Sequence, residues 1–195
     1  KVYGEYLEDY CSNFYYANKW PGSVGGIRKR IDPKYINKIA QNRKLEKTFV
    51  NKLGIKTTDW AYIKSAEDIK KNQNLLPGIL KSNTLGYDGK GQYRIQSKDE
   101  FDSLNVDFTK GYILEKLVKL KKEISIIITR FDRDKYEIYE PIENTHEDQI
   151  LKYSKIPSEI SEKIFNQSKE WAIQIAEELK YIGTLCVEFF IDRND

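Results

Sequence analysis

The 195-residue sequence predicts an α+β fold, because segments of helical periodicity are interspersed with runs rich in β-branched and aromatic residues. A second observation is that several β-rich runs follow one another directly in the middle of the chain, where we expect neighbouring strands to be antiparallel. A third is that the chain shows no internal repeat and no low-complexity linker. The sequence therefore predicts a mixed fold and not a repeat array.

Residues 1–31 are aromatic and glycine-rich and show no sustained period. The first helix signals follow this stretch. Pro33 suits the first turn of a helix that continues to Ala40. Asn42 is expected to cap a second helix, which Gly54 ends and whose apolar residues recur at helical spacing: Leu45, Phe49 and Leu53.

The middle of the chain alternates between strand and helix signals. A short strand is expected within "TTDWAYI", followed by a helix that Ser65 caps. Two strands, around 78–82 and 92–95, flank a glycine-rich loop, and a short helix is then entered through the capping-box pattern "SKDE".

The last third of the chain combines β-rich runs with the longest helix. The β-rich runs are 111–118, 122–130 and 136–142. The helix follows "IPSEI", and we expect one side of it to be lined by Ile160, Ile164, Ala172, Ile175, Ala176 and Leu179. Gly183 leads into the final strand, "TLCVEFFID".

Composition excludes several classes of protein. Apolar residues make up 39% of the chain and aromatic residues 13%, which is not the composition of a disordered chain. The net charge is only +3 and the charges alternate in sign, which argues against a nucleic-acid partner. Cys11 and Cys186 lack metal-site spacing, and neither a membrane span nor a signal peptide is found, so a reduced cytoplasmic protein is expected.

The loop in "GILKSNTLGYDGKGQYRI" has two interpretations. Asp88-Gly89 between two β-like runs is a hairpin signal. A two-residue turn, however, does not need the flanking glycines or the extra donors, which are Lys81, Gly86, Lys90, Gly91 and Gln92. Backbone amides in such a loop can turn together toward an anion. The loop matches neither a Walker sequence nor a dinucleotide fingerprint, so a phosphate loop carried between two strands stays open beside the plain hairpin.

Three acids lie in apolar surroundings. Glu188 is expected to share a strand face with Cys186 and Phe190, where it either pairs with a Lys or Arg or binds magnesium. Glu115 and Glu123 raise the same question, with surface acids at strand edges as the alternative. His146 is the single histidine and Arg43 begins a helix; a surface histidine and a solvated helix residue are the ordinary interpretations.

Taken in order, these motifs resemble a known family. The segments "AQNRKLEKTFVNKLGIKT", "GYDGKGQ", "ILEKLVKLKKEISIIITR", "NTHEDQIL" and "TLCVEFFI" are similar to the central part of the 5-(carboxyamino)imidazole ribonucleotide synthetase family. That family belongs to the ATP-grasp superfamily, in which two α+β subdomains grip ATP. The resemblance covers about residues 32–191. It implies an ATP-grasp domain over 32–195, with a lid subdomain at about 61–114 and a C-terminal subdomain at 115–195 that is incomplete.

The resemblance also implies roles for individual residues. The loop from Gly86 to Gln92, with Tyr87, Asp88, Gly89, Lys90 and Gly91, would close over ATP, and Lys81 would reach the nucleotide. Glu115, Lys116, Leu117 and Val118 match the hinge that meets the adenine edge, and Glu123 would hold the ribose. Arg43 and His146 would be further ATP contacts, and Glu188 a Mg²⁺ ligand. Tyr87, Asp88 and Lys90 would face the second substrate, with Asp88 and Lys90 as the catalytic candidates.

The activity that the resemblance implies is ATP-dependent carboxylation of 5-aminoimidazole ribonucleotide with bicarbonate, through carboxyphosphate, in purine biosynthesis. Its partners are then small molecules, with a homodimer in the full-length form. The family's N-terminal domain and its later Asn-Glu magnesium ligand are not found here, so we expect a chain truncated at both ends that binds nucleotide with negligible turnover by itself. The alternatives are another ATP-grasp ligase, such as a formate-dependent transformylase, and a non-catalytic ATP-binding module.

Overall fold

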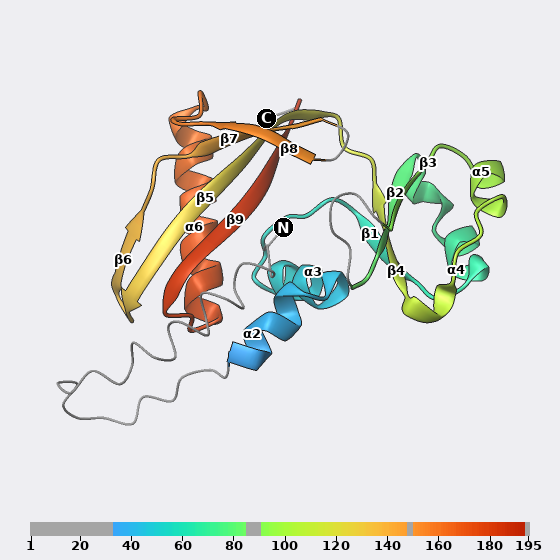
Figure 1. Ribbon diagram of the computed structural model, residues 1–195, viewed down its shortest axis with the longest axis horizontal. Coiled ribbons are helices and arrows are strands. Elements are labelled where there is room, and N and C mark those ends of the chain that lie inside the picture. Colours follow the sequence, from blue (N-terminus) through green and yellow to red (C-terminus); the bar gives the residue numbers. More distant parts are fainter. Residues whose placement is uncertain (1–32, 85–90, 148–149, 194–195) are drawn as a thin grey trace.

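The structure, a computed structural model, describes residues 33–84, 91–147 and 150–193 of the chain, and its strands form two antiparallel sheets with helices packed on them (Figure 1). The antiparallel pairing expected in the middle of the chain is confirmed. The interpretations placed on segment 1–31, and on Gly86, Tyr87, Asp88, Gly89 and Lys90, lie outside the described residues.

The first sheet has four strands in the order β1-β4-β2-β3, namely β1 (Trp60–Ile63), β4 (Tyr112–Lys116), β2 (Gly78–Ser82) and β3 (Gln92–Ile95). The short helices of this half are α4 (Ala66–Lys71), η1 (Gln73–Leu75), α5 (Lys98–Asp102) and η2 (Phe108–Lys110). One face of the sheet forms an apolar core with α4 and α5, built from Ile63, Ile69, Leu80, Ile95, Phe101 and Leu114.

Local sequence signals place the starts of these helices. The side chain of Ser65 accepts a hydrogen bond from the Asp68 amide, which confirms the predicted cap of α4. Ser97 does the same for the Glu100 amide at the start of α5. Glu100 returns its carboxylate to the amide of Gln96, 2.7 Å away, one residue before the cap. The capping-box pattern thus satisfies amides on both sides of the helix start.

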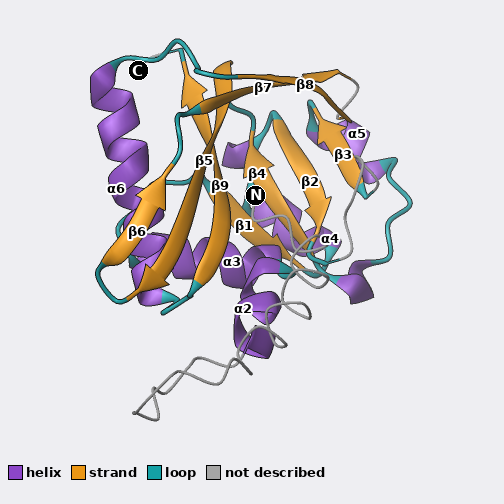
Figure 2. Cartoon of the chain, turned by 60° about the vertical axis from the view of Figure 1, so that its left-hand side comes forward, coloured by secondary structure: helices purple, strands orange, loops and turns teal. Residues whose placement is uncertain are grey.

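The second sheet is built around the long strand β5 (Leu120–Asp132), which pairs along most of its length with β9 (Gly183–Asp192). The other edge of β5 pairs with β6 (Lys135–Ile138) and with β7 (Ile142–Glu147), and β8 (Ile150–Lys155) extends the sheet from β7. Helix α6 (Glu162–Glu178) covers one face (Figure 2). The core on that face consists of Ile126, Ile128, Ala172, Ile175, Ala176, Leu185 and Val187.

Two strands of this half were missed and two expectations need correction. The sequence did not predict β7 and β8 as strands, because all six residues of β8 are exposed and neither strand shows an alternating apolar pattern. The β-rich run 136–142 is divided between β6 and β7, with Pro141, which cannot donate to a strand ladder, just before β7. Ile160 lies outside α6, because Ser161 is the residue that caps the helix.

Helices α2 (Pro33–Ala40) and α3 (Arg43–Lys52) lie between the two sheets (Figure 1). Phe49, Val50 and Leu53 pack against the core of the second sheet. The side chain of Gln174 on α6 donates to the Leu53 carbonyl, 3.0 Å away, at the end of α3. Helix α3 is therefore anchored on the second half of the molecule while its other residues reach the first sheet.

The first sheet ends at Lys116, two residues beyond the border predicted between the lid and the C-terminal subdomain. The names of these two subdomains stay predictions. None of the helices in the described ranges combines the length and the apolar character needed to cross a membrane.

Candidate functional site

The base of the glycine-rich loop is a β-hairpin. Lys81 on β2 lies opposite Gln92 on β3, and the Ser82 amide donates to the Gly91 carbonyl, 2.8 Å away. Gly91 has a φ of +71°, and a Cβ at this position would lie 2.8 Å from the Ser82 hydroxyl. The hairpin interpretation is thus confirmed for the base of the loop, while the phosphate-binding role of its tip stays a prediction.

The N-terminus of α3 is bound to this hairpin through Asn83, a residue that the sequence interpretation did not single out. The Asn83 carbonyl accepts from the Arg43 amide at 2.9 Å, and its side-chain oxygen accepts from the Lys44 amide at 3.0 Å. Its own amide donates to Gly111. The Arg43 side chain also donates through Nε to the Ser82 carbonyl, 3.0 Å away, so Arg43 is held against the base of the loop.

A buried ion cluster lies beside the hairpin. Lys81 Nζ is 2.7 Å from Glu115 Oε2, and Lys47 Nζ of α3 is 3.3 Å from Glu115 Oε1. The side chains of all three residues are at most 14% exposed, so the expectation of a surface acid at Glu115 is wrong. Two cations share one carboxylate here, which leaves the cluster with a net positive charge facing its surroundings.

The ionisation of Glu115 reflects this cluster. Burial by itself raises the pKa of the Glu115 carboxyl, but the charges and hydrogen bonds of Lys81 and Lys47 outweigh burial and hold its pKa below the ordinary value. The carboxylate is therefore ionised at neutral pH. It fixes the position of Lys81, whose ammonium group has three protons and keeps donors for a further acceptor.

The predicted hinge connects the two sheets after β4. The Lys116 carbonyl accepts from the Thr58 hydroxyl at 2.8 Å, and the Leu117 amide donates to the Pro77 carbonyl at 2.9 Å. The Val118 amide has no hydrogen-bond partner within the described part of the chain. The binding of an adenine edge by these hinge groups stays a prediction.

The second sheet brings Glu123 and His146 together on neighbouring strands, β5 and β7. His146 Nδ1 lies 2.7 Å from Glu123 Oε2, and no hydrogen bond to it is found among the described residues. The His146 side chain is 17% exposed, so it is half-buried on the sheet. Both residues lie on the face turned away from α6, because Ile126 and Ile128 of β5 face the helix.

Glu188 lies on this same face of the second sheet. Val187 belongs to the core beneath α6, so the side chains of Glu188, Cys186 and Phe190 share the opposite face, as predicted. Ser125 lies opposite Glu188, and the Asn144 amide donates to the Ser125 hydroxyl at 2.7 Å. Burial raises the pKa of the Cys186 thiol, and the Glu188 carboxylate acts in the same direction.

Magnesium binding by Glu188 stays a prediction. Among the described residues there is no group of three or more His, Cys, Asp or Glu side chains able to hold a metal ion. A magnesium site built from one or two carboxylates together with substrate phosphates does not need such a group. A single carboxylate on a polar sheet face fits that kind of site.

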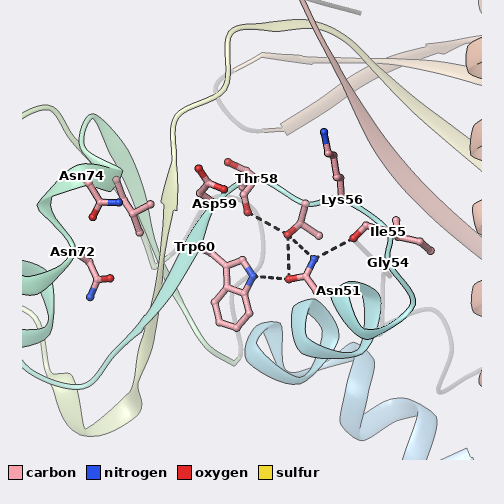
Figure 3. A pocket seen from close by; sticks show the side chains of 11 residues that line it. Asn51, Gly54, Ile55, Lys56, Thr58, Asp59, Trp60, Asn72 and Asn74 are labelled. Carbon is pink, nitrogen blue, oxygen red and sulfur yellow. Dashed lines mark hydrogen bonds between the residues drawn. The ribbon is translucent and has the colours of Figure 1, made fainter.

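A separate hollow of about 500 Å³ lies between the end of α3 and the first sheet (Figure 3). The Asn51 side chain donates to the Ile55 carbonyl and the Thr57 hydroxyl and accepts from the Trp60 indole at 2.9 Å. The predicted site residues do not line this hollow. These bonds fix the connection between α3 and β1, so we assign a structural role to the polar residues that line the hollow.

Comparison with known proteins identifies the class. The profile of the ATP-grasp domain family matches residues 48–195, so the chain belongs to the ATP-grasp family. It is similar to N5-carboxyaminoimidazole ribonucleotide synthase, the enzyme of the resemblance noted above, of Brucella melitensis: 35% identity over 166 residues, covering 83% of this chain and 46% of the relative. The corresponding enzyme of Bacillus subtilis is 31% identical, with coverage of 80% and 42%.

Solved structures agree with this result. The structure of N5-carboxyaminoimidazole synthetase from Staphylococcus aureus complexed with ADP matches with a TM-score of 0.75 and 33% identity. The match covers 82% of this chain and 43% of that one. The ATP-grasp fold and the family resemblance predicted from the sequence are thus confirmed, and the chain spans less than half the length of these relatives.

Proposed function

We propose that the protein binds ATP between its two sheets and belongs to an enzyme that carboxylates 5-aminoimidazole ribonucleotide with bicarbonate in purine biosynthesis. One observation carries the proposal: a buried lysine cluster at the base of a glycine-rich loop and a polar sheet face with Glu123, His146 and Glu188 lie on the two sides of one hinge. The similarity to synthases whose structures hold ADP supports it.

In the proposed reaction ATP phosphorylates bicarbonate, which gives carboxyphosphate and ADP. The exocyclic amine of 5-aminoimidazole ribonucleotide then attacks the activated carboxyl carbon, phosphate leaves, and the amine loses a proton as the new C–N bond forms. Because the acyl phosphate is labile, the protein contributes positioning, charge stabilisation and the exclusion of water more than covalent chemistry.

The first half of the chain supplies the phosphate side of the proposed site. Lys81 and Arg43 contact the nucleotide beside the loop that contains Gly91 and Gln92, and this loop covers the phosphates. Tyr87, Asp88 and Lys90 face the acceptor substrate. The hinge binds adenine through the Val118 amide, while Leu117 contributes apolar contact.

The second half supplies the ribose and metal side. The Glu123 carboxylate accepts from the ribose hydroxyls, since it has only acceptors to offer, and His146 beside it is a further contact. Glu188 would hold Mg²⁺ together with the phosphates, and the ion would offset their charge. The same proposal places the protein in the cytoplasm and its full-length form in a homodimer.

A second candidate function is a non-catalytic ATP-binding module, or another ATP-grasp ligase with a different acceptor. Both alternatives share the ATP-grasp domain that the chain contains, so they differ from the first proposal in the reaction and not in the fold. Release of ADP with different candidate acceptors separates the ligases from one another.

Calorimetric titration tests the shared part of these proposals. We expect the 195-residue chain to bind ATP and ADP in the presence of Mg²⁺, and the longest natural form of the protein to release ADP only when bicarbonate and 5-aminoimidazole ribonucleotide are both present. Binding without any ADP release in the longest form favours the module. Absence of adenine-nucleotide binding contradicts the proposed function altogether.

Glu188→Gln tests the metal assignment. Glutamine keeps the shape of the side chain but loses the charge that attracts Mg²⁺, so the variant should lose ADP release and the gain in ATP affinity that Mg²⁺ provides. Its far-ultraviolet circular dichroism should match that of the unchanged chain. Glu178→Gln, on the exposed side of α6, serves as the control. Full turnover of Glu188→Gln at saturating Mg²⁺ would exclude this residue as the ligand.

A further inference from the structure

Lys47 joins the site through a contact that does not follow from the sequence motifs. It lies one helical turn after Arg43 on α3, and its Nζ is 3.3 Å from Glu115 Oε1. The other carboxylate oxygen of Glu115, Oε2, is 2.7 Å from Lys81 Nζ. Glu115 is thus held from both sides, by a helix and by a neighbouring strand.

The contact between Lys47 and Glu115 changes the net charge of the cluster around Lys81. If Glu115 faced Lys81 alone, its carboxylate, 2.7 Å from Lys81 Nζ, would cancel most of the positive charge of Lys81, because the pair is largely shielded from water. Lys47 balances Glu115 from its second oxygen, and the cluster retains one positive charge. Such a charge in a buried place is costly unless an anion accompanies it, which points to an anionic ligand beside Lys81.

The other basic residues at the start of α3 make contacts of a different kind. Arg43 donates to the neutral Ser82 carbonyl, and Lys44 Nζ lies 4.3 Å from the centre of the Tyr62 ring. In these contacts, therefore, neither Arg43 nor Lys44 is paired with an acid. Lys47 is the residue of this group that meets the carboxylate of the cluster.

We propose that Lys47 is a positioning residue of the nucleotide site, which neutralises Glu115 and so leaves the charge of Lys81 available to the phosphate groups of ATP. The inference rests on the proposed function, since it names the ATP phosphates as the anion. Lys47 acts through Glu115 and Lys81 and does not itself touch the nucleotide.

Calorimetry on Lys47→Gln and Lys47→Arg tests the proposal, with ATP and adenosine as ligands. In Lys47→Gln, Glu115 is left to Lys81 alone, so ATP affinity should fall about tenfold while adenosine affinity changes less than about twofold. Lys47→Arg keeps the charge and should restore ATP affinity to within about threefold of the original. Lys52→Gln, an exposed position on the same helix, should change neither affinity.

The double variant Lys47→Gln/Glu115→Gln separates an indirect role from a direct contact. It removes one positive and one negative charge, so no carboxylate neutralises the charge of Lys81. ATP should therefore bind to the double variant more tightly than to Lys47→Gln. A direct contact of Lys47 with phosphate predicts no such recovery, and that result overturns the proposal. Equal losses for ATP and adenosine in Lys47→Gln overturn it as well, independently of whether the double variant folds.

These outcomes are distinct from failure of the proposed function. A chain without substitutions that binds no adenine nucleotide contradicts the ATP site itself. A chain that binds ATP normally but whose Lys47→Gln variant binds it equally well contradicts only the role assigned to Lys47.

Discussion

Replacing Glu115 by glutamine is expected to lower the free energy of unfolding by about 3 kcal/mol, because it leaves two buried ammonium groups without a counter-charge. Glutamine has nearly the same shape as glutamate, so the loss of stability measures the effect of the missing charge and not a change in packing. Urea unfolding followed by circular dichroism measures it.

Glu67→Gln is the matched control for this loss. Glu67 is an exposed acid 3.9 Å from Lys70 on α4, and its replacement should cost less than about 0.5 kcal/mol. If Glu115→Gln costs no more than this control, water reaches the cluster freely and the description of a buried ion cluster is wrong.

Acid should weaken the unchanged protein through the same carboxylate. The pKa of Glu115 is lowered in the folded state, so its contribution to stability is present above the ordinary glutamate pKa of about 4.3 and is lost as the pH falls through the lowered value. The stability difference between the unchanged chain and Glu115→Gln should therefore shrink in acid. A difference that stays constant from pH 7 down to about pH 3 contradicts this assignment.

Lys81→Met is expected to lower ATP affinity about 100-fold, because an ammonium group bonded to phosphate is replaced by an apolar side chain of similar length. Adenosine has no phosphate, and its affinity should change little. The fold should tolerate the change, since Glu115 keeps Lys47 at 3.3 Å as its counter-charge. Titration calorimetry with ATP, ADP and adenosine measures the three affinities.

Lys98→Met, an exposed position on α5, is the control and should leave all three affinities unchanged. A parallel loss for adenosine in Lys81→Met would mean that Lys81 shapes the pocket as a whole and does not bind phosphate. Unchanged ATP affinity would remove Lys81 from the site.

Much of the fold was predictable because its signals are local. Asn42, Ser65 and Ser97 cap their helices as expected, each bonding an amide three residues later in the chain. The apolar alternation of β9 placed Val187 and Glu188 on opposite faces. By contrast, β7 and β8 were missed, since the residues of these strands are mostly half-buried or exposed and carry no apolar period.

The candidate site was predictable only as a set of residues. The resemblance named Lys81, Glu115, Glu123 and His146 without indicating that Lys81 pairs with Glu115 or that Glu123 lies beside His146. Lys47 and Asn83 were not predicted at all. For Lys47 the one sequence signal is its position one helical turn after Arg43. The partners of Lys47 and Asn83 lie far away in the chain.

The sequence by itself determined the α+β class, the helix starts, the glycine-rich hairpin and, through its motifs, membership in the ATP-grasp family. The class, the helix starts and the hairpin depend on residue types at short spacing, which propensity, capping and strand alternation describe, while family membership came from the resemblance of the motifs. Only the tertiary structure decided that α3 bridges the two sheets and places Lys47 on Glu115, and that Glu123 meets His146. Such contacts depend on how distant segments pack, and packing is a property of the whole chain.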